Sequence, residues 1–110
     1  MLLRVTTGLL CVLSATGAHG ETPTLIHVDP VGGVYTQSWL IDDEIFYAAG
    51  IRTATVIGDG KLGDFKGTLY VDCGTPENSK WLSVEDLYLD ASAVPRAAIV
   101  GIRKALCDQP

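Results

Sequence analysis

Histidine is scarce in this chain, and its scarcity excludes much of the chemistry that small enzymes perform. The 110 residues include two histidines, and His27 is the one that lies beyond the N-terminal leader described below. A Ser-His-Asp arrangement would have to use it. None of the serines beyond the leader lies in a nucleophile-elbow sequence: Ser38, Ser79, Ser83 and Ser92. We therefore expect no catalytic residue.

The sequence also lacks the usual signatures of metal and phosphate sites. His27, Cys73 and Cys107 lie far apart, without the paired spacing of a zinc site. The acidic stretches 42–44 and 58–64 lack the alternating acids and late glutamate of a calcium loop, although a calcium protein stays an alternative. The glycines of 58–64 match neither the Walker pattern nor the dinucleotide fingerprint. We expect no metal and no cofactor.

Basic residues and long apolar runs are few as well. Arg4 is the only charged residue before Glu21, so seven basic and 13 acidic residues follow the leader, for a net charge of −6. An excess of acid argues against binding to nucleic acid or to an anionic membrane surface. Beyond the leader, no apolar stretch approaches the roughly 20 residues of a membrane-spanning helix.

The N-terminus has the pattern of a secretory signal peptide over residues 1–20. A basic start at Arg4 precedes an apolar stretch that is densest over 9–13, and small residues at 18 and 20 suit cleavage before Glu21. Two alternatives stay open: an uncleaved membrane anchor, and lipid attachment at Cys11, which Leu10 disfavours. Removing 20 of the 110 residues leaves one domain, 21–110, which we expect to be periplasmic or secreted.

Two cysteines lie beyond the leader, and export sets their redox state. In an oxidising compartment, Cys73 and Cys107 are most simply a disulfide, with two free buried thiols as the alternative. The bond would tie the end of a central strand to the end of the domain.

Residue patterns predict a sheet and one helix. Alternation is clearest in 65–72, and aromatic or β-branched residues mark the other strands. The predicted strands are 25–28, 34–41, 51–57, 65–72 and 80–84, the last continuing at 87–90. The acidic run at 42–44 predicts the start of a short helical segment that Gly50 closes. An apolar stripe from Pro95 to Leu106 predicts a C-terminal helix.

These elements predict an α+β domain, with a small antiparallel sheet packed against one C-terminal helix and tied by one disulfide. One face of the sheet should form the core with the helix. The residues expected there are Trp39, Ile41, Ile51, Ile57, Leu69, Val71, Leu82, Ile99, Ile102 and Leu106.

Three places resemble the surface-adhesin protein E family of small exported bacterial proteins. They are 42–56, where an Asp, an Ile and a Gly precede a strand; 69–73 with Trp81, Leu82, Ser83 and Tyr88; and the end of the terminal helix at Cys107. Together they span roughly residues 39–107. The resemblance implies the fold and the cystine, and adhesion as a function, but it carries over no binding residue.

Two kinds of function follow from these features, with a small hydrolase or a calcium protein as a third alternative. The first is a non-catalytic envelope protein that binds a host or envelope protein, in the manner of an adhesin. The alternative is a small periplasmic inhibitor of a basic enzyme such as lysozyme, which the acidic charge would attract. Tyr70 and Thr68, opposite the core side of strand 65–72, are the candidate binding surface. A free strand edge could also form a homodimer.

The leader generates the first prediction. Protein recovered from the periplasm or the medium should begin at Glu21, as intact mass spectrometry would measure. An intact Met1, or a mass increased by lipid at Cys11, would contradict the assignment of a cleaved signal peptide.

Overall fold

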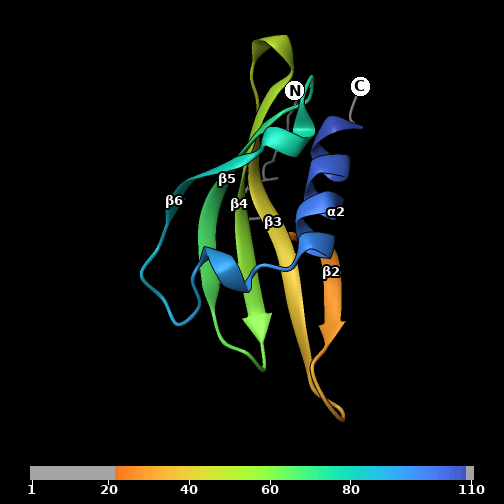
Figure 1. Ribbon diagram of the computed structural model, residues 1–110, viewed down its shortest axis with the longest axis vertical. Helices are drawn as coiled ribbons and strands as arrows, with labels where there is room; N and C mark the ends of the chain where they lie inside the picture. Colours follow the sequence, from red (N-terminus) through yellow and green to blue (C-terminus); the bar gives the residue numbers. More distant parts are fainter. Residues whose placement is uncertain (1–21, 109–110) are drawn as a thin grey trace, which may run out of the picture.

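The computed structural model describes residues 22–108, and the predicted signal peptide 1–20 lies outside them. Within the described residues, five antiparallel strands form one sheet in the order β2-β3-β4-β5-β6, and helix α2 lies against one of its faces (Figure 1). The predicted α+β class is therefore confirmed. The strands are β2 Thr24–Pro30, β3 Thr36–Phe46, β4 Ile51–Gly60, β5 Phe65–Asp72 and β6 Lys80–Val84. The helices are α2 Arg96–Cys107 and the 3₁₀ turns η1 Ala48–Gly50, η2 Pro76–Asn78 and η3 Ala91–Ala93.

Strand β5 shows why these residues form a sheet with one buried side. Phe65, Gly67, Leu69 and Val71 are buried, and the residues between them are not. Side chains alternate between faces along a strand, so this pattern places every second residue in the core. Strand β4 repeats it with Ala54, Val56 and Gly58.

A buried glutamine fixes the loop between β4 and β5. Gln37 Nε2 donates to the carbonyl of Gly63 at 2.9 Å, and Gln37 Oε1 accepts from the N–H of Leu62 at 2.9 Å. Gly60 has a φ of 145°, and a Cβ there would lie 2.4 Å from the Thr36 carbonyl oxygen. The loop therefore needs glycine at 60 and an amide side chain at 37.

The acidic run does not begin a helix, which corrects the prediction for 42–50. Strand β3 continues to Phe46, because β4 offers it a partner along this whole length. Asp42 pairs with Thr55 and Ile45 with Thr53, so two residues oppose one and form a β-bulge. Asp43 occupies the bulge with a φ of 50°. Of the expected helical segment only η1 forms, and it ends at Gly50 with a φ of 78°, a conformation that favours glycine.

The predicted continuation of the strand at 87–90 is also wrong. The Leu89 N–H donates to the Asp64 carbonyl, so the chain after β6 bonds to the β4–β5 loop instead of extending the sheet. Asp90 then begins η3, where its carboxylate accepts from the hydroxyl and the N–H of Ser92. These two hydrogen bonds lower the pKa of Asp90.

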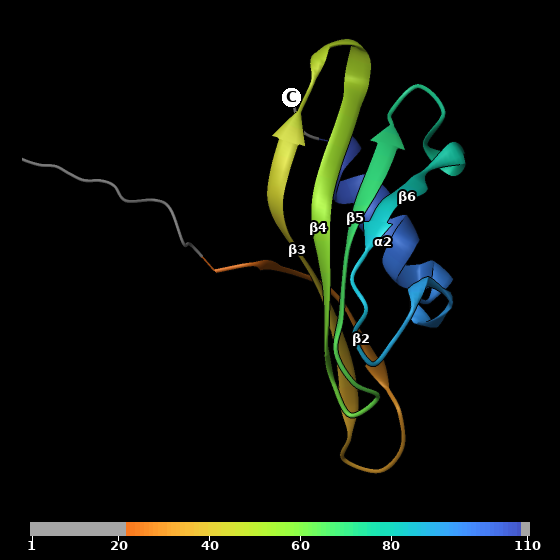
Figure 2. The same cartoon turned by 90° about the vertical axis from the view of Figure 1, so that its left-hand side faces the viewer.

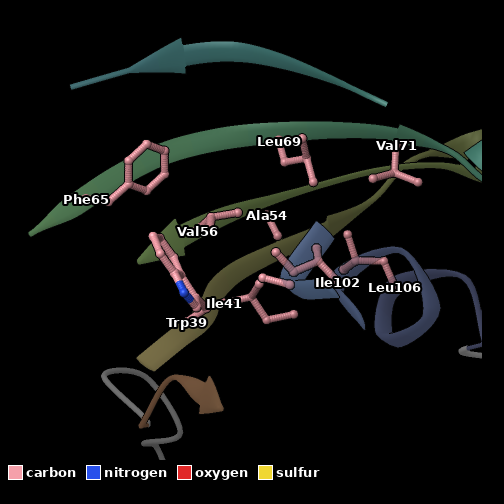
Figure 3. Packing of buried hydrophobic residues seen from close by; sticks show 10 residues of the cluster. Trp39, Ile41, Ala54, Val56, Phe65, Leu69, Val71, Ile102 and Leu106 are labelled. Carbon is pink, nitrogen blue, oxygen red and sulfur yellow. The ribbon is translucent and has the colours of Figure 1, made fainter. Parts of the chain in front are cut away.

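The core lies between α2 and one face of the sheet. Six of the predicted core residues are fully buried there: Trp39, Ile41, Leu69, Val71, Ile102 and Leu106 (Figure 3). Ala54, Val56, Phe65 and Ala98 complete it. Ile99 is partly buried against it.

Three of the predicted core residues belong to the other face of the sheet. Ile51 and Ile57 pair with Asp72 and Lys66, which alternate with the buried residues of β5. The side chain of Leu82 is 54% exposed. The reason is the register: β4 and β5 pair so that Ala54 meets Leu69 on the buried face, and the neighbours of Ala54 then point away.

A glycine inside α2 has a packing reason. A Cβ on Gly101 would lie 2.8 Å from the Cγ2 atom of Ile26, which packs against the core from β2. Glycine costs about 1 kcal/mol against alanine in a helix. Here it allows α2 to approach β2 closely.

The predicted disulfide is confirmed. Cys73 follows β5, and Cys107 is the last residue of α2; their sulfurs are bonded and their Cα atoms are 5.4 Å apart. Cys73 also donates its N–H to the Gly50 carbonyl. The bond therefore joins β5 and α2 close to the point where the β3–β4 connection returns to the sheet.

We predict that Cys73→Ser lowers the free energy of unfolding by roughly 4 kcal/mol, the chain-entropy estimate for a loop of this size. The two cysteines are 34 positions apart in the chain. Denaturant titration would measure the loss. Cys107→Ser and the double variant should show the same loss, because all three remove one bond. A double variant much less stable than either single variant would contradict this.

Ile102→Ala should cost about 2–5 kcal/mol, because it leaves a cavity at a fully buried position of α2. Val100→Ala is the matched control, since Val100 lies on the same helix and is 45% exposed. It should change stability by less than about 0.5 kcal/mol. Equal losses in the two variants, measured by denaturant titration, would mean that the helix face is misassigned.

Candidate functional site

The face of the sheet opposite α2 is the candidate site, and we name it the open face. Figure 2 shows α2 on one side of the sheet, and no other helix described within residues 22–108 covers the opposite side. On β4 the open face presents Ile51, Thr53, Thr55 and Ile57. On β5 it presents Lys66, Thr68, Tyr70 and Asp72.

An apolar hollow lies at one end of the open face. It has a volume of about 330 Å³, is open to solvent, and is lined by Tyr47, Ile51, Thr53, Tyr70 and Leu82. The pairing of β4 with β5 brings two of these residues side by side, because Thr53 on β4 is paired directly with Tyr70 on β5.

Flanking elements complete the hollow. Leu82 belongs to β6 and lies where the register between β5 and β6 shifts. Tyr47 is the residue directly after β3. The β3–β4 connection that carries Tyr47 projects beyond the rest of the sheet in both views (Figures 1 and 2). Leu82 and Tyr47 are each about half exposed. The arrangement suits the binding of an apolar group that enters from solvent.

The two predicted surface residues have different positions on this face. Tyr70 lines the hollow, and the ammonium of Lys80 lies 5.1 Å from the centre of its ring. Thr68 pairs with Thr55 on the same face but does not line the hollow. Both side chains are half-buried.

Sequence reasoning missed most of the hollow. The sequence pattern places Ile51 and Leu82 in the core, and no motif marks Tyr47 or Thr53. One signal could have found part of it: in 51–58 the polar Thr53 and Thr55 fall at alternate positions, with the small Ala54 between them. That alternation assigns Ile51 and Ile57 to the threonine side.

Charge differs between the open face and the helix. The open face and the adjoining bulge carry five acids, Asp42, Asp43, Glu44, Asp59 and Asp72, against the bases Lys66 and Lys80. Lys66 lies 3.9 Å from Glu85, which offsets its charge. Helix α2 instead carries Arg96, Arg103 and Lys104 and no acid. The open face with its bulge therefore carries more acids than bases, whereas α2 carries bases alone.

His27 is not brought together with a nucleophile. Its Nε2 atom lies 2.6 Å from the Asp29 carboxylate, and within residues 22–108 no serine hydroxyl hydrogen bonds to the imidazole.

The neighbouring acids Asp42 and Asp43 are joined by a hydrogen bond, in which Asp43 donates its backbone N–H to the Asp42 carboxylate. No three His, Cys, Asp or Glu side chains gather as a metal site among the described residues. In the same part of the chain, no helix is long and apolar enough to span a membrane.

Comparisons with protein-family models, with curated proteins and with solved structures gave no match to this chain. The resemblance to the surface-adhesin protein E family stays a prediction from the sequence.

Proposed function

We propose that this protein is a non-catalytic exported binding protein, periplasmic or secreted, that holds a protein partner on its open face as an adhesin-like module. The observation that carries the proposal is the apolar hollow on an uncovered sheet face. The disulfide is consistent with an oxidising location outside the cytoplasm.

Exposed apolar side chains around the hollow support this proposal. Ile45, Tyr47 and Leu82 are each about half exposed, although the domain has a buried core on the other face. Contiguous exposed apolar surface marks interaction sites in soluble proteins. Tyrosines such as Tyr47 and Tyr70 are frequent anchors of binding energy, because they bury a large rigid ring.

Features of the strand edges favour binding of a partner on the open face over pairing at an edge of the sheet. Edge strand β2 ends at Pro30 and follows Pro23, and proline cannot donate a ladder hydrogen bond. Strand β6 has five residues and an irregular register. The end of β3 that β2 does not pair with carries the bulge and its acids, 42–44. Bulges, charges, prolines and short strands all discourage edge-to-edge association. A homodimer through an edge is tested by measuring the mass in solution.

An inhibitor of a basic enzyme such as lysozyme is the second candidate, and the acidic open face favours it. Incubating the protein with lysozyme separates the two candidates. Inhibition of lysozyme at a stoichiometric ratio supports the inhibitor hypothesis. Full lysozyme activity in the presence of the protein supports the binding-protein hypothesis instead.

We predict that Leu82→Ser weakens partner binding at least about 10-fold, because it removes the apolar wall of the hollow. Leu87→Ser is the matched control: Leu87 is 43% exposed and lies outside the hollow. Immobilised wild-type and variant proteins would be compared for the proteins they retain from periplasm and host matrix. Loss with Leu82→Ser and Tyr70→Ser, and retention with Leu87→Ser, is the expected result.

Two outcomes would contradict the proposal. Equal retention by wild-type protein and Leu82→Ser would exclude the open face. A turnover that His27→Ala abolishes, with the fold intact by circular dichroism, would exclude a purely binding function.

A further inference from the structure

The hollow and its charged surroundings point to a more specific ligand, and we infer that the open face binds a basic polypeptide segment that inserts one apolar side chain into the hollow. The inference rests on the proposed function, since it names the partner chemistry of the same face. It combines two independent features: the size and lining of the hollow, and the distribution of charge around it.

The hollow has the size for one large side chain. Its volume is about 330 Å³, and an apolar cavity of about 150 Å³ already binds benzene. The floor residues Ile51 and Thr53 belong to a central strand of the sheet, so the backbone below the hollow is held on both sides. A ring or branched aliphatic group entering there would replace solvent at Leu82 and Tyr70 without opening the core.

Unpaired carboxylates lie beside this hollow. Asp72 pairs across the sheet with Ile51, which lines the hollow, and follows Tyr70 by two residues on the same face. Asp42 pairs with Thr55, two residues from Thr53 on that face. Each carboxylate accepts a backbone N–H, from Gly74 and Asp43 respectively, and neither forms an ion pair within residues 22–108. Their charges therefore remain to attract a cation from outside.

The cations of the domain do not neutralise this surface. Arg52 is directed to the other side of the sheet, where its guanidinium donates to the Leu106 and Tyr47 carbonyls and lies 4.5 Å from the centre of the Phe46 ring. Lys80 lies over Tyr70 at the rim of the hollow. Close to the hollow, the one ammonium of Lys80 therefore stands against the two carboxylates of Asp42 and Asp72, which leaves a net negative charge around the hollow.

A second copy of this chain is a poorer occupant. Residues after the leader carry a net charge of −6, and face-to-face packing would bring two sets of open-face acids together. Like charges brought together across an interface oppose association. A basic segment from another protein meets the opposite situation, because its charges complement the rim.

The test uses three short peptides as probes of the folded protein without its leader. The first is oligolysine with one central tryptophan, the second has alanine in place of tryptophan, and the third has glutamates in place of the lysines. Fluorescence anisotropy of labelled peptides gives the affinities, and amide NMR shifts locate the site. We expect the lysine–tryptophan peptide to shift Thr53, Tyr70 and Leu82, and to bind at least about 10-fold more tightly than either other peptide.

Two sets of variants separate the apolar and ionic contributions. Leu82→Ser should weaken the lysine–tryptophan peptide about 10-fold, and Leu87→Ser should leave its affinity unchanged. Asp42→Asn with Asp72→Asn should weaken it several-fold and reduce its dependence on salt, because each asparagine keeps an acceptor oxygen for the N–H group. Asp64→Asn with Asp86→Asn is the control for the loss of two charges, because both residues are exposed and lie outside the hollow.

Different failures have different meanings. Tight binding of the glutamate peptide at the hollow would contradict the inference that the partner is basic, and the open face would remain a binding surface. No shift at the hollow with any peptide would overturn this inference, while retention of proteins by wild-type protein and not by Leu82→Ser would still support the proposed function. A dimer that Leu82→Ser converts to monomer would replace the basic segment by a second copy.

Discussion

The disulfide between Cys73 and Cys107 joins the end of β5 to the end of α2, and the arrangement of the domain depends on it. With the two Cα atoms 5.4 Å apart, the last turn of α2 has to lie at the end of β5. Arg52 supports the same placement, because its guanidinium reaches the Leu106 carbonyl from the buried side of β4. The helix of 12 residues covers one face of the sheet, and Leu89 and Val94 of the segment between β6 and α2 pack against the same core. The opposite face is left to solvent, and the hollow follows from that.

The bulge at Asp43 has two structural effects on the β3–β4 hairpin. By setting two residues against one, it changes which residues of β3 face each side, so that Ile45 joins Thr53 on the open face. It also places an acidic, irregular stretch on the part of β3 that β2 leaves unpaired. That edge is thereby protected from pairing with another chain. One of these acids, Asp42, also lies beside the hollow, since it pairs with Thr55, two residues from Thr53.

Much of the fold could be predicted, because its signals are local. The alternation of 65–72 identifies β5 and its buried side, and the stripe through Ile102 and Leu106 identifies α2. Two cysteines in a chain that is expected to be exported indicate the bond. The candidate site could not be predicted in the same way. Ile51 and Leu82 are as apolar as core residues, and their side of the sheet is decided by cross-strand register rather than by their own identity. The acids at 42–44 fit a helix start equally well until β4 is present as a partner for β3.

The open face combines an apolar hollow with threonines and acids, and this composition limits how it can bind. Thr55 and Thr68 interrupt the apolar residues of β4 and β5, and the apolar hollow lies at one end of the face. A partner bound as proposed would therefore gain most of its contact energy at one anchor. Exposed acids such as Asp43 and Glu44 would mainly accelerate the encounter with the proposed basic partner. Added salt should then act mostly on the association rate, and Leu82→Ser mostly on the dissociation rate.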